Sequence, residues 1–204
     1  MRFLKPLIAA VALTTAISAA PVAMAQRGGA SGVMVINYQR VIEASDVGRD
    51  MTTKLGQIAQ QVQGELQPEA QAIEQEQQSI QQATQGMNEE QVRRNTQLQQ
   101  RVEAFAVRYN QFRQRQVTLS RDLEYTRQVT LNDFNQQITP FVREVMEQRN
   151  AGVVLDASTT QLIQPNVDAT DDVVQRLNQR LRTINVTRQS APQPQQQQQA
   201  PPQQ

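Results

Sequence analysis

The sequence contains no cysteine, no histidine and no tryptophan. Without cysteine and histidine the chain has no thiol nucleophile, no disulfide and none of the side chains that most often bind zinc or haem. A serine-histidine-aspartate triad is excluded because it requires an imidazole. The sequence therefore predicts a protein that is not an enzyme, with no catalytic residue, no metal ligand and no cofactor.

Large apolar side chains are also scarce. Only 4% of the 204 residues are aromatic and 38% are hydrophobic, whereas glutamine occurs 38 times. Such a composition argues against one thick globular core and favours extended helices.

The first 25 residues have the pattern of a secretory signal peptide. Arg2 and Lys5 precede an apolar run over residues 7–20, and Ala23-Met24-Ala25 supplies the small residues that signal peptidase requires. The alternative is a transmembrane anchor, but this run is shorter than the ~20 residues that span a bilayer. We therefore expect cleavage after Ala25 and export of the mature chain.

Removal of this segment changes the charge of the protein. The whole chain carries 20 basic and 19 acidic residues, and loss of Arg2 and Lys5 would leave 18 basic residues against the same 19 acidic ones. A nucleic-acid-binding protein normally presents a strongly basic surface. We expect no nucleic-acid partner.

The mature sequence divides into a body, a pair of helical arms and two flanking segments. Residues 26–32 form a flexible leader, 33–46 a first part of the body with a strand and a short helix, and 47–149 the arms. Residues 150–187 form a second part of the body, with strands at 153–155 and 161–163 and a helix reaching Ile184. The Pro/Gln-rich residues 188–204 are expected to be disordered.

Apolar residues at spacings of three and four predict one long helix in each arm. The seam of the first helix thins after Val62 to one apolar residue per heptad, and the seam of the second is interrupted at Gln116. After Leu123 the next seam residue is Leu131, one position out of phase. Pro68 and Pro140 predict bends or hinges within these helices.

The turn between the arms is predicted near residues 84–88. Gly86 suits a residue that ends a helix in the left-handed conformation, and Asn88 and Gln91 have the spacing of a capping box. Residues 43–90 carry a net charge of −7 and residues 93–127 a net charge of +5. The arms therefore attract each other, which favours an antiparallel hairpin. The predicted fold is mainly α, with a small β body from which this hairpin projects.

Two strand motifs at the ends of the hairpin resemble the Skp/OmpH family of periplasmic chaperones. They are Val33-Met34-Val35-Ile36-Asn37 and Val153-Val154-Leu155-Asp156-Ala157-Ser158, and the resemblance extends over residues 33–184. It implies a homotrimer in the periplasm, with three hairpins around a cavity that holds unfolded outer-membrane proteins without ATP. The strand residues that would build the trimer body are Val33, Val35, Val153, Val154 and Leu155.

If such a cavity exists, the apolar residues outside the seam are the candidates for client contact. These candidates are Val107, Val117 and Val129, together with Arg108 and Arg115. The arginines have an alternative role in pairing with glutamates across the hairpin, and a further one in weak contact with anionic lipid or lipopolysaccharide. The alternative function is a structural coiled-coil spacer or adaptor of the cell envelope.

Overall fold

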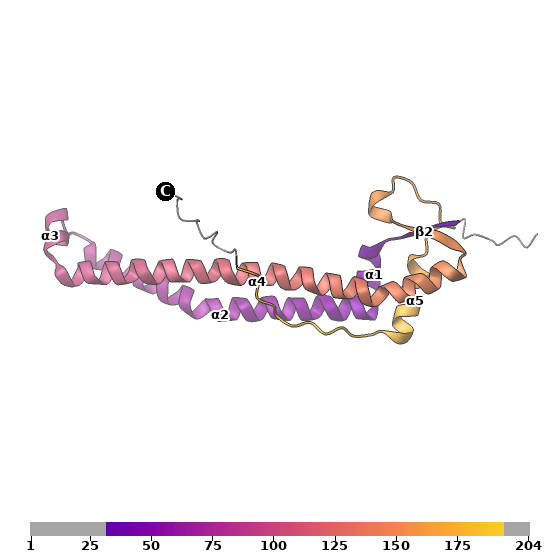
Figure 1. Cartoon of the computed structure of the whole chain (residues 1–204). Helices are drawn as coiled ribbons and strands as arrows, with labels where there is room; N and C mark the ends of the chain where they lie inside the picture. Colours follow the sequence, from indigo (N-terminus) through magenta and orange to yellow (C-terminus); the bar gives the residue numbers. More distant parts are fainter. Residues whose placement is uncertain (1–31, 194–204) are drawn as a thin grey trace, which may run out of the picture.

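The structure is a computed structural model that describes residues 32–193. The predicted signal peptide, its cleavage site, the leader up to residue 31 and residues 194–204 lie outside the described residues. Two long helices run side by side from a small body at one end to a short helical tip at the other (Figure 1).

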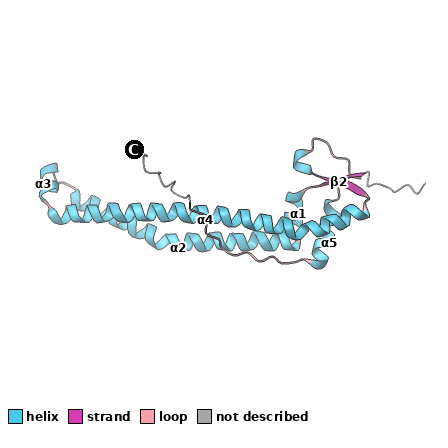
Figure 2. Ribbon diagram, viewed as in Figure 1, coloured by secondary structure: helices cyan, strands magenta, loops and turns pink. Residues whose placement is uncertain are grey.

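The chain is built from two strands and five α-helices within the described residues. Their order is β1 (Gly32–Ile36), α1 (Tyr38–Ala44), α2 (Asp46–Thr84), α3 (Glu89–Arg94), α4 (Thr96–Gln148), β2 (Ala151–Asp156), a 3-10 turn η1 (Ala157–Thr159) and α5 (Thr170–Arg180). Helix dominates and the strands are confined to the body (Figure 2). The predicted fold class, mainly α with a small β body and a long helical hairpin, is confirmed.

The two strands pair in parallel although more than a hundred residues separate them. Val33 lies opposite Val153, and Val35 lies opposite Leu155. On its other edge β1 is held by the segment before α5, because the Val35 amide donates to the Val167 carbonyl at 2.8 Å. Within residues 32–193 the outer edge of β2 has no strand partner.

The strand expected over residues 161–163 is not formed. These residues lie in an irregular loop in which Leu162 is 92% exposed. Pro165 lacks the amide hydrogen that a strand ladder needs, and a turn over residues 165–167 redirects the chain. The backbone reaches β1 only at Asp168, through a single bridge to Val35.

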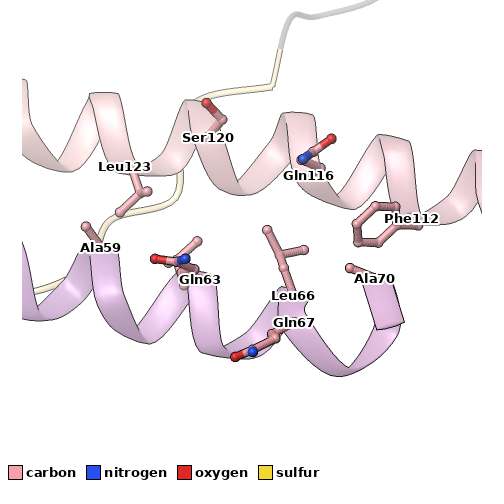
Figure 3. Close-up of a pocket in the computed structure, with 10 residues that line it drawn as sticks. Ala59, Gln63, Leu66, Gln67, Ala70, Phe112, Gln116, Ser120 and Leu123 are labelled. Carbon is pink, nitrogen blue, oxygen red and sulfur yellow. The ribbon is translucent and has the colours of Figure 1, made fainter. Parts of the chain in front are cut away.

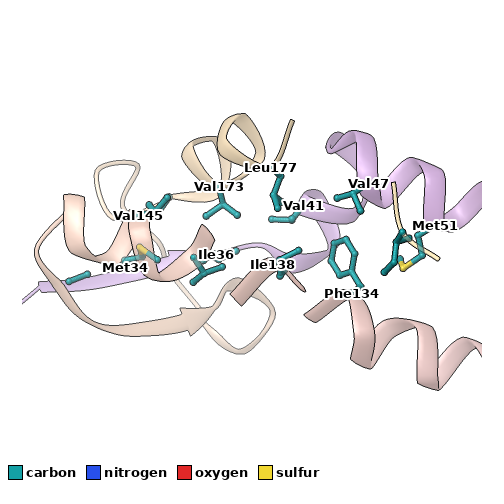
Figure 4. Close-up of a cluster of buried hydrophobic side chains, with 14 residues drawn as sticks. Met34, Ile36, Val41, Val47, Met51, Phe134, Ile138, Val145, Val173 and Leu177 are labelled. Atoms are coloured by element: carbon teal, nitrogen blue, oxygen red, sulfur yellow. The ribbon is translucent and has the colours of Figure 1, made fainter. Parts of the chain in front are cut away.

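The hydrophobic core lies in the body and at the base of the hairpin. It is formed by β1, α1, α5 and the body-proximal ends of α2 and α4, whose labelled side chains converge in Figure 4: Met34, Ile36, Val41, Val47, Met51, Phe134, Ile138, Val145, Val173 and Leu177. Burial of one such side chain contributes about 1.5–3 kcal/mol. Few aromatic residues are enough for this core, because it is confined to one end of the molecule and the rest of the hairpin needs only a narrow apolar seam.

The arms differ in length, and the C-terminal end of the longer helix α4 extends into the body. α2 has 39 residues and α4 has 53, which at 1.5 Å per residue correspond to roughly 60 and 80 Å. Pro68 and Pro140 both lie inside continuous helices. α2 follows one side of α4 near the body and crosses it toward the tip (Figure 1).

The tip follows the predicted turn chemistry but contains one more helix than expected. Gly86 has a φ of 82°, and the capping box between Asn88 and Gln91 is present. The helix that starts there ends after six residues, because Asn95 interrupts it and caps α4 by accepting a hydrogen bond from the Leu98 amide at 3.0 Å. The second arm was expected to be one helix from residue 88 onward, and this expectation is wrong.

The C-terminal helix is shorter than expected, and the residues after it lie along the hairpin up to residue 193. α5 ends at Arg180, and residues 181–193 form an extended segment along the hairpin, which we call the strap (Figure 1). Helix was expected through Ile184 and disorder from residue 188. Instead, Asp50 and Lys54 bind the backbone of Ile184, and Thr126 binds the backbone of Gln189. Contacts with distant residues outweigh local helix propensity here.

The junction of α1 and α2 leads to the first prediction. Ser45 caps α2 by accepting from the Gly48 amide, and a Cβ at Gly48 would lie 2.1 Å from the Ile42 carbonyl oxygen. Gly48→Ala should therefore destabilise the protein by about 1–3 kcal/mol or more. Gly64→Ala is the control, because a Cβ there meets nothing within 4 Å and alanine should stabilise the helix by about 0.5–1 kcal/mol. Urea denaturation measures both, and equal stabilities would contradict the close approach.

Candidate functional site

The described residues contain no arrangement suited to metal chemistry. No group of three or more Asp or Glu side chains is placed to hold a metal ion among residues 32–193. No helix in the same range is long and apolar enough to cross a bilayer. The remaining candidates for a functional site are the grooves and exposed side chains of the arms and of the body.

A groove of about 450 Å³ opens between the arms, at the middle of α2. Its apolar lining comes from Val62, Leu66 and Ala70 on α2, and from Phe112 and Leu123 on α4. Figure 3 shows Leu66 and Phe112 pointing into the space between the two helices. A second groove of about 500 Å³ continues toward the body along Leu55, Ile58 and Leu123.

The groove lies where the seam of α4 is interrupted. Gln116 replaces the apolar residue that the heptad of α4 requires, and the small residues Ala59 and Ala70 line the two ends of the groove. Close packing normally leaves few voids along a helix pair. Here the two helices leave an apolar groove open, and small residues and glutamines line its rim.

The predicted client-contact residues do not gather at this groove. Val107 and Val117 are exposed at 57% and 53%, whereas Val129 is partly buried. None of these three valines lines either groove. Leu66 and Phe112, which do line the first groove, have the heptad spacing of seam residues. The only hint of a groove in the sequence was the gap at Gln116.

The arginines of α4 include several that pair with acidic residues of α2. Arg101 binds Glu76 through two hydrogen bonds of 2.6 and 3.1 Å, and Arg115 lies 3.3 Å from Glu69. The hydrogen bond from Arg101 and the charges of Arg101 and Arg108 lower the pKa of Glu76, against a smaller opposing effect of burial. Arg108 and Arg115 thus contribute to attraction within the hairpin.

The body exposes an apolar surface beside the free edge of β2. It consists of Val33, Val153 and Leu155 from the strands, and Leu162 and Ile163 in the loop that follows β2 are exposed as well. Val35 is buried inside the chain at 3% exposure, and Val154 is partly buried against the core. The five predicted body residues therefore divide between the surface and the interior.

Electrostatic contacts fix α5 against the C-terminal end of α4. Glu144 of α4 accepts hydrogen bonds from Arg176 at 2.9 Å and from Arg180, and Arg149 binds Asp172 at 2.7 Å. Burial alone would raise the pKa of Asp168, but hydrogen bonds from the Thr170 hydroxyl and amide, together with the charges of Arg40 and Arg149, lower this pKa. The segment that pairs with β1 is thereby held in place.

A buried polar row on α4 was missed by the sequence analysis. Asp122, Thr126 and Thr130 are almost completely buried, and they occupy successive turns between the seam residues Leu119 and Phe134. The strap covers Asp122 and Thr126. The phase slip between Leu123 and Leu131 was its one trace in the sequence.

The pattern of β1, the hairpin, β2 and α5 matches a known family. The family model described as outer membrane protein (OmpH-like) matches residues 32–177, which is well over half of the chain. The chain belongs to this OmpH-like family. The family match ends within α5, so the strap lies beyond it.

A solved structure has the same fold. It is the crystal structure of a protein from Caulobacter crescentus CB15, described as a candidate OmpH-like outer membrane chaperone. The TM-score is 0.65 at 24% sequence identity, over 78% of this chain and 91% of that chain. The comparison with curated proteins gives no match.

The contacts of Glu144 give a prediction about pH. A hydrogen bond from Arg180 has the largest effect on the pKa of Glu144, and burial opposes it. Together with the charge of Arg180 and the hydrogen bond and charge of Arg176, it holds this pKa below its ordinary 4.5. A lowered folded pKa contributes stability above the unfolded value, and this stability is lost as pH falls through the folded value. Glu144→Gln should therefore lower the melting temperature at neutral pH, and the difference should shrink below pH 4.5.

Glu103→Gln is the matched control, because Glu103 is exposed on the same helix. Calorimetry at neutral and acidic pH measures both variants. A Glu144→Gln difference that stays constant across this range would contradict the assigned ion pairs.

Proposed function

We propose that the protein is an ATP-independent holdase chaperone of the periplasm, which binds unfolded outer-membrane β-barrel proteins between its arms. Membership in the OmpH-like family supports the assignment to outer-membrane proteins. The structural neighbour described as a candidate outer membrane chaperone supports the chaperone role. The predicted signal peptide supports export.

The apolar groove within a long polar hairpin is the observation that carries this proposal. Unfolded β-barrel strands expose apolar residues at alternate positions and cannot bury them without a membrane. The arms offer them apolar side chains at intervals, at the groove and at exposed Val107 and Val117, among glutamines and arginines. Many contacts of about 1 kcal/mol each add to a useful affinity while the client stays mobile.

Trimer formation through the body completes the proposed cavity. β2 has a free edge within the described chain, beside exposed Val33, Val153 and Leu155. Free strand edges with apolar neighbours normally require a partner. A closed symmetric trimer would bury the free β2 edge of each of its three copies. The arms would then project from one base and surround a shared space.

Contact with anionic lipid or lipopolysaccharide is a weaker part of the proposal. Arg101 and Arg115 already bind glutamates of α2, and the mature chain would be close to neutral. A spacer or adaptor role in the envelope predicts a fixed partner and no affinity for unfolded chains.

The trimer proposal is tested by a charge at the exposed strand position 155. Leu155 is 42% exposed in the single chain, so the carboxylate of Leu155→Asp would be solvated in a monomer. A trimer would bury the same carboxylate. Burial of an unpaired charge costs on the order of several kcal/mol. Sedimentation should show monomers with unchanged helix content. Val117→Asp on the arm is the control, and trimers in both variants would contradict the proposal.

The holdase proposal is tested by aggregation of a denatured β-barrel protein on dilution. The intact protein should suppress aggregation without ATP. Joining Ile58 to Glu124 by a short turn removes residues 59–123, and with them every residue that lines the groove; this armless protein should lose suppression yet keep the trimer. Because the mature charge is near zero, suppression should fall only modestly between low and physiological salt. Full activity of the armless protein would refute binding between the arms, and no activity of the intact protein would favour the spacer.

A further inference from the structure

The strap lies as an extended chain across both helices of the hairpin, in the half nearest the body (Figure 1). It contacts α2 at Asp50, Lys54 and Glu65, and α4 at Thr126 and Asp122. We call the surface that these five residues form the channel. No residue of the strap falls within the family match, which ends at residue 177.

The channel binds the strap mainly through its backbone. The Ile184 amide donates to Asp50 at 3.0 Å, and the Ile184 carbonyl accepts from Lys54 at 2.6 Å. The Gln189 amide donates to the Thr126 hydroxyl and the Ala191 amide to the Asp122 carboxylate, each at 2.9 Å. Every residue except proline offers these same backbone groups. The contacts therefore select an extended conformation rather than a particular sequence.

The side chains of residues 184–187 in the strap follow the alternation of a β-strand. Ile184 is buried at 3% exposure and Val186 is partly buried, whereas Asn185 and Thr187 between and after them are exposed. Inward and outward side chains alternate in this way in any extended chain that lies on a surface. Ile184 is the single fully buried side chain among residues 181–193, so one anchor and a few hydrogen bonds hold the strap.

The α4 side of the channel is built to receive backbone amides. Thr126 donates its hydroxyl hydrogen to the Asp122 carbonyl at 2.7 Å, which leaves the hydroxyl oxygen free to accept from the strap. Asp122 offers its carboxylate one turn away. A helix seam would ordinarily place apolar residues at these levels, and the hairpin does not need this polar row for its own pairing.

We propose that the strap is a displaceable resident ligand, and that the channel also binds extended segments of unfolded polypeptide with apolar side chains at alternate positions. This inference rests on the proposed holdase function and adds to it a binding site outside the groove of Figure 3. Unfolded barrel strands have the required alternation. The strap, tethered at an effective concentration of roughly millimolar, occupies the channel until a client that binds at several points displaces it.

The first test opens the channel in the full-length protein. Ile184→Asp removes the buried anchor, and Asn185→Asp adds the same charge at the exposed neighbouring position. The probe is a fluorescein-labelled peptide with the sequence of residues 182–193, measured by fluorescence anisotropy. The Ile184→Asp protein should bind it at least tenfold more tightly than the Asn185→Asp protein. The same peptide carrying aspartate in place of Ile184 should not bind.

The second test closes the channel and does not depend on the first. The Gln189 amide lies 2.9 Å from the Thr126 hydroxyl oxygen, and the natural chain has no cysteine, so the Thr126→Cys/Gln189→Cys double variant has a single disulfide to form. Oxidation should lower the affinity for a denatured β-barrel protein at least threefold relative to the same protein under reductant. The natural protein, treated identically, should show no change.

The outcomes separate this inference from the proposed function. If the natural protein suppresses aggregation but neither the disulfide nor Ile184→Asp changes binding of client or peptide, the channel proposal is overturned and the holdase stands. If the opened channel binds the peptide but no form of the protein suppresses aggregation, the holdase proposal falls and the channel remains an extended-peptide site.

Discussion

Parallel pairing of β1 with β2 is the contact on which the arrangement of the arms depends. The strands lie at opposite ends of the hairpin in sequence, so they meet only if the second arm returns the full length of the first. Because α4 is longer than α2, its last turns pass the start of α2 and contribute Phe134, Ile138 and Val145 to the core. The sheet therefore closes a loop that includes the whole hairpin, and closure of a longer loop costs more entropy.

The elements that could be predicted from the sequence depend on neighbours along the chain. Heptad spacing predicted the long helices, and Gly86 with Asn88 predicted the turn, because a left-handed glycine and a capping box are local features. The strap could not be predicted in this way. Its apolar residues up to Ile184 continue the helical spacing of α5, and only Asp50 and Lys54, more than a hundred residues earlier, bind that backbone instead.

The candidate site shows the same division. Gln116 marked an interruption of the seam, but which residues of α2 line the groove beside it, Ala59 and Ala70 among them, depends on how the two helices pack. Of the valines expected to face a client cavity, Val107 and Val117 are exposed and Val129 is partly buried. Exposure alone does not bring them together, because residues ten apart on a helix lie about 15 Å apart along its axis.

The tip of the hairpin has a consequence for how proteins of this design diverge. α3 contains no buried residue, its charged side chains pair within the helix, and its cap is closed by its own Asn88 and Gln91. Nothing in the body contacts it, so the tip imposes no fixed distance from the base. Deletion or duplication of one heptad in both arms at the same level would keep the seam in phase and leave the sheet untouched. Arm length is thus free to change during evolution in steps of about 10 Å, and a descendant could lengthen or shorten its arms without redesign of its base.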